Sequence, residues 1–598
     1  MFLALVILLM MPLAASAAEF RVNVTLDLAD VNLGDGICSA GPAGGEAEAC
    51  SLRAAIMEAN ALGGPDRHVI HLPAGLYQLT RRHSSGFAGL EEDERQLANG
   101  EGAIHHDAFN DLDIGVDLEI RGAGEDTTSV EGFAIDRVFH VLNRDLRQPA
   151  PQFVRFADLA IRSGRSLQRG SGVFLEAVRE AHFEDVTIED NRGTAFSEID
   201  GVLFASIGGG MHSRAFDLFL TRCTFRNNFA TVGGGLAVSA GWATIRDTTF
   251  DGNEARSPGS GGPGIVGGRP GMGGGIAMLD SEPSPTFLVM TGSTLTGNSA
   301  THGGGLGTWA GASVVNSTFS GNSADFAGGG AYIRTAVSAR LTHFEFTTIV
   351  GNTARDGGGI HRETFVRSEV HRSRFTISRS IVADNTPGNC ALTGAPHPIS
   401  NGQNLETADT CGFTSSTDLR NTAPRLGPLR DNGGPTLTHA LGGLSPAINR
   451  AGRSAYTVDQ RGFPRPEGSA MDIGAFEYSM PMLLTDYRIP GRFETLFGFT
   501  VRLEIQGTSG AKITEIVPAM EGLKVSVEID KSGRAATVSA SGLKIDVNAV
   551  RKQTKQKQPA LFYVAADTAQ DGSEMVVIAN PRFDATLSEI TKLPLGQK

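Results

Sequence analysis

The sequence predicts an all-β protein in which a long stacked solenoid precedes a small C-terminal β-sandwich. A short pattern recurs between residues 218 and 385: an apolar anchor, an Asn three residues later, and then a glycine triplet. Successive anchors are 25, 45, 24 and 30 residues apart. Such a period indicates short coils that stack on one another instead of a single globular core. The anchor–Asn pairs are Phe225–Asn228, Phe250–Asn253, Leu295–Asn298, Phe319–Asn322 and Ile349–Asn352.

The composition narrows the classes of protein to consider. The chain has 598 residues and 76 Gly, without the strict Gly-X-Y period of collagen. Its formal net charge of −13 argues against nucleic acid or an anionic membrane as the main partner, because both require a basic surface. Every Lys lies at Lys512 or later, so the end of the chain differs in composition from the rest. We therefore expect residues 481–598 to form a separate domain.

The N-terminus has the features of a secretory signal peptide in residues 1–18. The apolar run Phe2–Met11 is followed by small residues at 15–17, which are typical of a cleavage site. The basic residues that usually precede such a run are absent, since the first Lys or Arg is Arg21. No later apolar run is long enough to cross a membrane. We expect an exported protein without a transmembrane segment.

Five Cys residues fit an exported protein with two local disulfides. Proximity in the sequence predicts one bridge between Cys38 and Cys50 and another between Cys390 and Cys411. Cys223 is left over. It lies two residues before an anchor, and the period of two in a strand places it on the same face as that anchor. We therefore interpret Cys223 as a small buried hydrophobe and not as a nucleophile.

Residues 19–80 are expected to form an N-terminal cap and the first coil. Ser51 suits the N-cap of a helix, and a helix with one apolar face would cover the exposed end of a solenoid. That face comprises Leu52, Ala55, Ile56 and Ala59. The segments 69–72 and 76–79 then predict two strands joined by a turn.

Two polar segments near the N-terminus raise the question of a metal ion. Asp27, Asp30 and Asp35 lie in one Gly-containing loop, and three carboxylates can bind calcium. Their spacing does not match an EF-hand, so we favour a solvated acidic turn. The insert 81–110 also holds groups that bind transition metals, and a solvated loop is again the favoured interpretation. Those groups are Glu91, Glu92, Asp93, His105, His106 and Asp107.

Two sets of motifs carry a resemblance to a known family. Cys50-Ser-Leu-Arg-Ala-Ala-Ile56, followed by Val-Ile-His-Leu-Pro-Ala-Gly-Leu-Tyr at 69–77, resembles the N-terminal signature of exported bacterial CSLREA-domain proteins. Motifs within residues 386–480 resemble the closing module called the choice-of-anchor Q domain. These motifs are Cys390…Cys411, Leu426–Pro435, Asp459–Gly462 and Asp472–Glu477.

The resemblance covers about residues 20–478 and implies a fold without implying a reaction. The implied fold is a right-handed parallel β-helix of the pectin-lyase-like shape, which we expect over residues 81–385, between the capping helix and the closing module. The family usually has Cys immediately before the last motif, where this chain has Met471, and another before Asp459, where residues 451–458 contain none. We expect this module to lack one bridge, a loss of roughly 2–4 kcal/mol of stabilisation.

We interpret the repeat itself as scaffold. The Asn residues are expected to stack at turns and satisfy one another's amides, and the glycine triplets permit positive φ and tight corners. Phe-x-x-Asn followed by Gly-Gly-Gly-Leu is similar to the repeats of chlamydial polymorphic outer-membrane proteins. Function is therefore expected on what interrupts the scaffold: the insert 81–110, the loop 257–271 and the C-terminal domain.

The C-terminal residues 481–598 alternate as short strands separated by Gly and Ser turns, which suits a small β-sandwich. A basic cluster within it is more typical of a solvated loop than of a ligand site. That cluster comprises Arg551, Lys552, Lys555 and Lys557.

The residues favour a binding protein over an enzyme and leave the enzyme open. The β-helix region has no Lys, which excludes a Lys base there, whereas an Arg base remains open. No Asp-Asp pair of the polygalacturonase kind, Gly-x-Ser-x-Gly or His-Glu-x-x-His motif is present. We expect an extracellular or bacterial cell-surface protein that binds polysaccharide or surface glycans in a non-catalytic adhesion or matrix role. The alternative is a lyase or hydrolase of acidic polysaccharide. No cofactor is expected, with calcium left open.

Overall fold

The structure is a computed structural model that describes most of the chain to residue 478 and separate strands beyond it. The described residues are 17–41, 49–81, 110–133, 136–143, 150–166, 168–194, 197–199, 202–256, 265–266, 271–280, 286–335, 341–364, 375–393, 399–478, 495–496, 499–505, 512–518, 524–531, 535–541, 545–546, 562–567 and 578–584. Nearly all of the expected signal peptide, of the insert 81–110 and of the loop 257–271 lies outside these residues, as does the basic cluster at 551–557. The chain divides into two compact units, residues 1–422 and 423–598.

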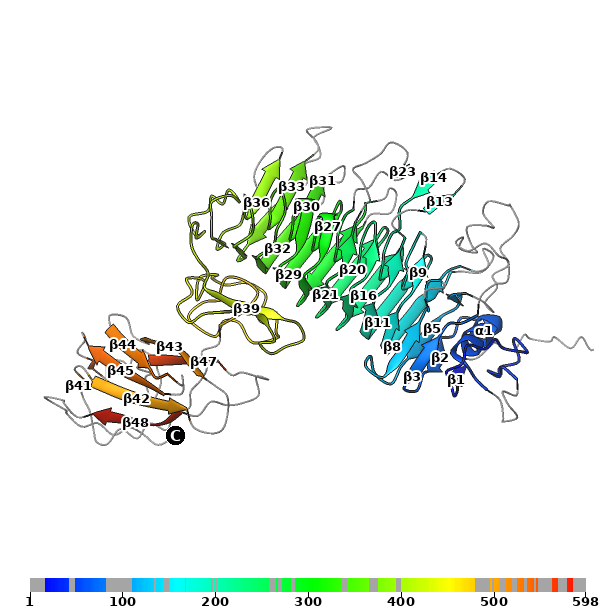
Figure 1. The fold of residues 1–598 in the computed structure, drawn as a ribbon, viewed down its shortest axis with the longest axis horizontal. Coiled ribbons are helices and arrows are strands. Elements are labelled where there is room, and N and C mark those ends of the chain that lie inside the picture. The colour runs from blue at the N-terminus through cyan, green and yellow to red at the C-terminus, as the bar shows by residue number, and fades with distance from the viewer. Residues whose placement is uncertain are drawn as a thin grey trace, which may run out of the picture. The chain divides into compact units, whose positions relative to one another are not determined.

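The first unit is a parallel β-helix, as the sequence predicted (Figure 1). A single coil illustrates the plan. It consists of β16 (Asp217–Thr221), β17 (Thr224–Arg226), β18 (Phe229–Ala230) and β19 (Leu236–Val238), and β20 (Trp242–Arg246) begins the next coil. Each strand pairs in parallel with its equivalent one coil later, as β16 does with β20 and β19 with β24 (Ile276–Met278). Three long parallel sheets result, which we call sheets A, B and C.

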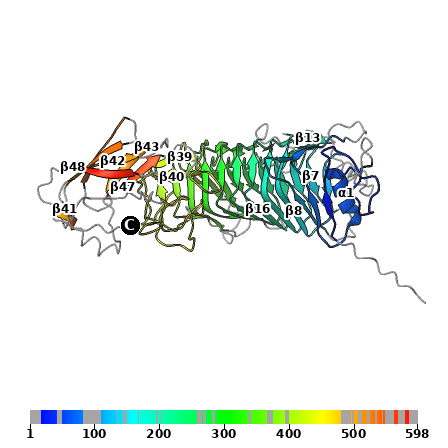
Figure 2. The same ribbon diagram turned by 90° about the horizontal axis from the view of Figure 1, so that it is seen from below.

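Figure 2 shows the equivalent strands of successive coils side by side along the stack. Within the described residues, sheet A has 19 strands, sheet B ten and sheet C six. The other strands of sheet A are β1 (Glu19–Arg21), β2 (His68–His71), β3 (Gly75–Gln78), β5 (Leu118–Arg121), β6 (Thr128–Glu131), β8 (Phe153–Arg162), β11 (Glu180–Glu189), β21 (Thr249–Asp251), β25 (Phe287–Thr291), β26 (Thr294–Thr296), β29 (Gly311–Ser320), β32 (Thr342–Val350), β34 (Phe375–Ser378), β35 (Ile381–Ala383), β37 (Ile399–Ser400) and β38 (Leu405–Glu406). Those of sheet B are β4 (Leu112–Ile114), β7 (Phe139–Val141), β10 (Val173–Leu175), β15 (Met211–Ser213), β28 (Leu306–Thr308), β31 (Ala331–Thr335), β33 (Ile360–Thr364) and β36 (Cys390–Thr393). Those of sheet C are β9 (Arg165–Ser166), β12 (Arg192–Gly193), β22 (Glu254–Ala255), β27 (Ser299–His302) and β30 (Ser323–Ala327). A separate three-stranded sheet contains β13 (Ser197–Ile199), β14 (Val202–Phe204) and β23 (Ile265–Val266).

The predicted capping helix is α1 (Leu52–Leu62), at the N-terminal end of the stack (Figure 1). Its N-cap is Ser51, whose Oγ accepts a hydrogen bond from the backbone N–H of Ala54 at 3.0 Å. The helix ends at Gly63, which adopts a positive φ of 57°. The predicted apolar face is fully buried and contacts β2 and β4, so α1 shields the first coils from water.

The interior of the β-helix is filled by apolar side chains from equivalent positions of successive coils. The anchors occupy one such row, since the strand pairing aligns Phe225 with Phe250, Leu295 and Phe319 in turn. All are fully buried, and the rings of Phe225 and Phe250 stack with centroids 4.8 Å apart. The anchor residues therefore form the core, as expected from the repeat.

The glycine triplets are required by backbone geometry at the corner before sheet B. Gly233 has a φ of +66°, which an L-residue rarely adopts. A Cβ on Gly234 would lie 2.5 Å from the backbone oxygen of Glu254 and 2.6 Å from that of Gly274. The equivalent glycines of adjacent coils approach closely because backbone N–H groups of one triplet donate to carbonyls of the next, as Gly234 does to Gly273 at 3.1 Å and Gly235 to Gly274 at 3.0 Å.

The parallel ladders continue past residue 385. β36 pairs with β33, β37 with β34 and β38 with β35. The disulfide between Cys390 and Cys411 lies in this last part of the stack. The first part of the segment 386–480 therefore belongs to the β-helix unit.

The second unit begins with an antiparallel pair, β39 (Leu426–Arg430) and β40 (Thr438–Leu441). Asp459 and Glu477, from the last two motifs of the choice-of-anchor Q resemblance, lie in a buried ionic network. Arg461 Nη2 is 2.7 Å from Asp459 Oδ2, and Arg465 Nη1 is 3.2 Å from Glu477 Oε2. These motif residues are therefore structural, since their side chains hold loop backbone and one another.

The described strands beyond residue 494 pair in antiparallel. A four-stranded sheet has the order β44 (Lys524–Ile529), β45 (Ala535–Ser541), β42 (Phe499–Ile505) and β48 (Ile578–Asp584). Two further pairs are β43 (Lys512–Pro518) with β47 (Phe562–Asp567), and β41 (Thr495–Leu496) with β46 (Ile545–Asp546). Because β43 also contacts β44 and β45, the arrangement is a small β-sandwich, as predicted. Among the residues described here, no helix has the length and apolar character needed to span a membrane.

Candidate functional site

The three carboxylates for which calcium was the less favoured interpretation accept hydrogen bonds from donors of the protein. Asp27 accepts a hydrogen bond from Arg53 Nε at 2.6 Å, and both side chains are buried. Asp30 and Asp35 accept hydrogen bonds from N–H groups of their own loop. The three do not form a cluster of converging ligand atoms among the described residues. The other candidate group, around His105 and His106, lies outside the described residues.

The cysteines lie where the sequence placed them. Disulfides join Cys38 to Cys50 and Cys390 to Cys411. Cys223 is free and lies in the core, 2% exposed. Burial raises the pKa of its thiol to about 12, which keeps it protonated at physiological pH. The interpretation of Cys223 as a buried hydrophobe is confirmed.

An unpredicted feature lies on the outer face of sheet A, where five consecutive coils each contribute one aromatic ring. They come from β8, β11, β16, β20 and β25, which pair with one another in that order. We call this set the aromatic stripe. It comprises Phe153, His182, Phe219, Trp242 and Phe287.

The stripe is partly stacked and accessible to solvent. The ring centroid of His182 lies 5.0 Å from that of Phe153 and 4.5 Å from that of Phe219. The ring centroids of Trp242 and Phe287 are 5.4 Å apart. Trp242 is 53% exposed. Partial burial lowers the pKa of His182, so its ring stacks as a neutral aromatic group at pH 7. The guanidinium carbon of Arg67 lies 3.3 Å from the Phe153 ring centroid and covers one end of the stripe.

Charged side chains form a ladder beside the N-terminal half of the stripe. Arg155 bridges Glu119 and Glu184, and Arg222 Nη2 lies 2.7 Å from both Glu184 Oε1 and Asp185 Oδ2. Hydrogen bonds from Arg155 and Arg222 hold the pKa of Glu184 below its usual value. Glu184 is thus ionised at neutral pH, and the opposite charges of the ladder are paired.

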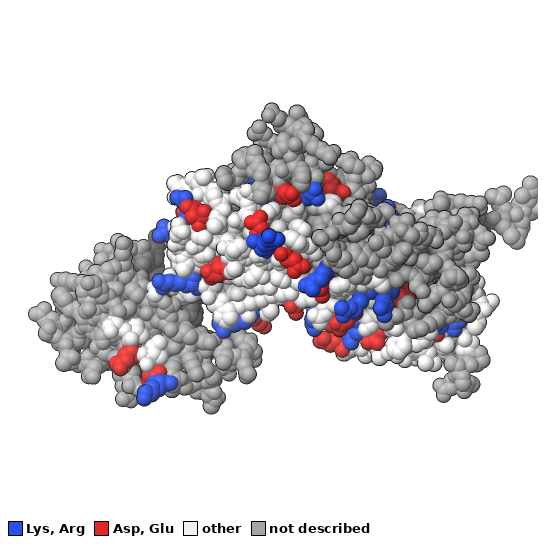
Figure 3. Space-filling model, turned by 45° about the horizontal axis from the view of Figure 1, so that its top comes forward, with Lys and Arg blue, Asp and Glu red and all other residues white. Residues whose placement is uncertain are grey.

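Figure 3 shows the same mixing of charge on one face of the molecule, where Lys and Arg lie among Asp and Glu. No extended patch of one sign is visible on the described part of that face. Such a surface suits an uncharged ligand better than a polyanion.

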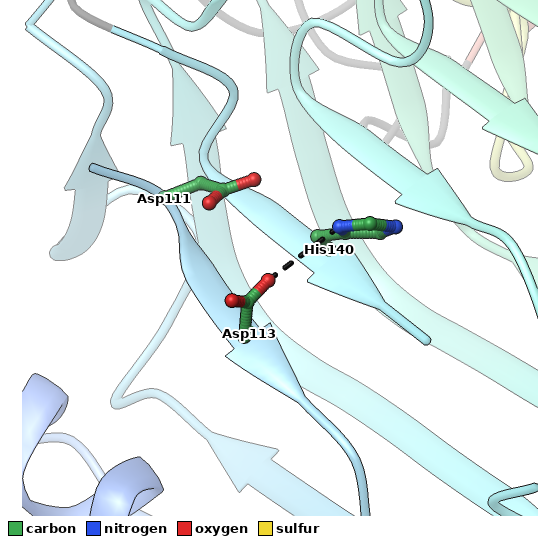
Figure 4. Close-up of side chains that lie close together, drawn as sticks. All are labelled: Asp111, Asp113 and His140. Carbon is green, nitrogen blue, oxygen red and sulfur yellow. Dashed lines mark ion pairs between the residues drawn. The ribbon is translucent and has the colours of Figure 1, made fainter. Parts of the chain in front are cut away.

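A second feature lies on the outer face of sheet B, where two carboxylates meet a histidine (Figure 4). Asp111 precedes β4, Asp113 lies within β4, and His140 lies in the neighbouring strand β7, opposite Asp113 in the strand register. His140 Nδ1 is 3.5 Å from Asp113 Oδ1, and both residues are buried. We call these three residues the Asp–His cluster.

The surroundings of the Asp–His cluster are rich in charge. Arg137 Nε lies 2.9 Å from Asp111 Oδ2, and His140 Nε2 lies 3.4 Å from Glu176 Oε2. Burial, followed by the charges of Asp113 and Asp136, raises the pKa of Asp111 well above its usual value. Chemically, such a group of residues can hold a cation or a proton.

Another polar cluster lies farther along sheet B. The Tyr332 hydroxyl donates to Glu363 Oε2, and its ring stacks on His361 at 5.5 Å. Arg334 lies 3.9 Å from Glu363 and its guanidinium carbon is 5.0 Å from the Trp309 ring. Burial, and the contact with Glu363, raise the pKa of Tyr332, so its phenol acts as a donor and not as a base.

Comparison with protein-family models, with curated proteins and with solved structures finds no match.

Proposed function

We propose that this protein is an exported, non-catalytic binding protein that holds glycan chains against the aromatic stripe. The observation that carries the proposal is that five consecutive coils of sheet A each place one aromatic ring on its outer face, in two adjacent rows of the strand register. Adjacent coils are about 4.8 Å apart, so the stripe extends over about 19 Å. Trp242 is exposed and the other four rings are half-buried, and aromatic surface that remains accessible to solvent over this length suits an interaction site for an extended ligand.

The chemistry of the stripe fits a sugar chain with little charge. The apolar faces of pyranose rings pack on aromatic rings, while hydroxyl groups at their edges need polar partners. The ladder of Arg155, Glu184 and Arg222 supplies such partners next to the rings. Its charges are paired, and the net charge of −13 disfavours a strongly acidic chain.

Two observations support export. Disulfides persist in oxidising compartments, and two are present. The features of a signal peptide in residues 1–18 point the same way. We propose that the protein is extracellular, at a bacterial cell surface, and that residues 481–598 attach it there.

Deletion of 481–598 is expected to release the protein into the medium, and unchanged fractionation of the truncated chain would contradict attachment by this domain.

Binding is tested with the full chain on a panel of immobilised neutral and acidic polysaccharides. We expect binding to a neutral glycan and at least about tenfold weaker binding for Trp242→Ala and for Phe219→Ala, which corresponds to about 1.4 kcal/mol. Phe326→Ala is the control, because Phe326 is 43% exposed but belongs to sheet C. The proposal fails if no glycan binds, or if the two stripe variants bind as well as the control.

The Asp–His cluster supports a second candidate, a lyase or hydrolase of acidic polysaccharide. Asp111 has the raised pKa that a general acid needs, and Arg137 lies beside it. Assays for new reducing ends and for unsaturated products on the same panel distinguish the two functions. Turnover that is abolished in Asp111→Asn would replace the non-catalytic proposal with this one.

A further inference from the structure

We propose that the Asp–His cluster binds a divalent transition-metal ion, with zinc as the best fit. Asp111, Asp113 and His140 each offer one ligand atom, and these atoms lie within 4.8 Å of one another. Zinc ligands at about 2.0–2.1 Å in a tetrahedron are about 3.4 Å apart. The separation of 3.5 Å between His140 Nδ1 and Asp113 Oδ1 matches that spacing.

The second observation is the state of Asp113. This residue is only 8% exposed, and its Oδ1 accepts no hydrogen bond from any described residue. The atom faces His140 (Figure 4). A buried carboxylate oxygen without a donor is costly unless a cation compensates it. A metal ion between Oδ1 and Nδ1 would supply that compensation.

The orientation of His140 gives an independent argument. A histidine that binds a metal through one ring nitrogen usually donates the other N–H to a carboxylate, which fixes the ring. His140 places the two groups on the corresponding sides of its ring, because its Nδ1 faces Asp113 whereas its Nε2 lies 3.4 Å from Glu176 Oε2, an ion-pair distance without hydrogen-bond geometry. The ring also stacks on Phe174, with centroids 5.0 Å apart. Glu176 is thus a positioning residue for a ligand histidine.

The ligand set selects the class of ion. Calcium takes six to eight oxygen ligands, whereas the cluster offers two carboxylates and one imidazole nitrogen. Imidazole with carboxylate suits zinc or manganese, and zinc binds such ligands more tightly. Three protein ligands leave a fourth position open for water. The site lies on sheet B, so it is independent of glycan binding on sheet A.

The test uses the untagged full chain after treatment with EDTA, titrated with ZnSO₄ in a calorimeter, with MnCl₂ and CaCl₂ in parallel. We expect one zinc ion per chain, weaker manganese and no calcium at this site. Asp113→Asn and His140→Gln are each expected to weaken zinc binding by at least about tenfold. His361→Gln is the matched control, because His361 is also a buried histidine of sheet B and lies 3.3 Å from Asp356, but it belongs to no group of three converging ligand atoms among the described residues. It should bind zinc as the wild type does.

A variant at a half-exposed position is included because the substitutions at the buried residues Asp113 and His140 could lose zinc binding through misfolding alone. Glu176 is 39% exposed in its side chain, so Glu176→Gln should fold and still weaken zinc binding about tenfold. Cobalt substitution should give the intense visible absorption of a tetrahedral ion. The proposal is overturned if no zinc binds, if the variants at 113, 140 and 176 all bind zinc like the wild type, or if binding is lost only in a His105→Gln/His106→Gln double variant.

Discussion

The side-chain amide of Asn253 donates a hydrogen bond to Oδ1 of Asn298 in the next coil, at 2.9 Å. The same Oδ1 accepts the backbone N–H of Asn253 at 3.0 Å, and Asn253 Nδ2 also donates to the carbonyl of Phe225. This relationship repeats along the stack, so each buried amide supports the previous one. The ladder comprises Asn191, Asn228, Asn253, Asn298, Asn322, Asn352, Asn385 and Asn389.

Loss of one member should destabilise its neighbours. Asn298→Ala would leave the backbone N–H of Asn253 and one of the two N–H groups of its side-chain amide without an acceptor inside the protein. We expect a loss of about 2–3 kcal/mol and faster hydrogen exchange at the Asn253 amide. Ser299→Ala, at the adjacent half-buried position, should change neither quantity. Equal exchange rates in wild type and Asn298→Ala would show that the ladder contributes little.

The Asn ladder could be predicted because it depends on spacing within a coil. Each Asn of the ladder before Asn389 follows an apolar anchor by three residues, whatever the length of the loop between coils. The same holds for the glycine triplets and for Cys223, whose environments are set by the nearest strand. Local periodicity is therefore sufficient for the scaffold.

The aromatic stripe could not be predicted in this way, because it depends on register between coils of unequal length. The pairing aligns Trp242 with Phe287, whereas Phe219 is aligned with Thr244, two residues farther along. The rings are thus divided between two adjacent rows, with His182 and Phe219 in one row and the other three in the second, and they have no constant spacing in the sequence. The Asp–His cluster is similar, since only the pairing of β4 with β7 places His140 opposite Asp113.

The N-terminal carboxylates show where residue counting misleads. The sequence places Asp27 in one loop with Asp30 and Asp35, whereas in the structure its partner is Arg53 of α1, 26 residues later. The motif that contains Arg53 predicts a helix, but it does not indicate toward which carboxylate the buried Arg53 guanidinium points.

The pair of Arg53 and Asp27 should be essential for the cap. Both side chains are 1% exposed, and Arg53 Nε is 2.6 Å from Asp27 Oδ1. Arg53→Met leaves Asp27 buried without its cation, which should cost about 3–5 kcal/mol. The control is Arg21→Met, because Arg21 pairs with Glu19 on the surface and such pairs contribute at most about 1 kcal/mol. Urea unfolding of both variants measures the difference, and equal effects would contradict the importance assigned to burial.

Cys223 should be chemically silent in the folded protein. Its thiol is 2% exposed and donates to the carbonyl of Phe183 at 3.4 Å, and burial raises its pKa to about 12. Titration with a thiol reagent should detect no reactive group in the native chain and one in denaturant without reductant, since the other four cysteines are bridged. Cys223→Ala should preserve the fold, with a loss of about 1 kcal/mol for the lost packing. Rapid labelling of the native chain would contradict the core position.

Asp472 gives the second unit a pH dependence with a definite sign. Burial and the neighbouring Glu477 raise its pKa to about 7 in the folded protein, whereas an unfolded Asp titrates near 3.9. Between these two pKa values the folded state binds more protons than the unfolded state. The contribution of Asp472 to stability is therefore complete below about pH 4 and is lost as the pH rises through about 7. Asp472→Asn stays neutral and should lose this dependence. The backbone N–H of Ile473, which donates to Ala447, reports the effect by hydrogen exchange. The protection factor of the Ile473 amide in the wild type, divided by that in Asp472→Asn, should fall as the pH rises from 4 to 8. A constant or rising ratio would show that Asp472 is ionised in the folded protein over this whole pH range.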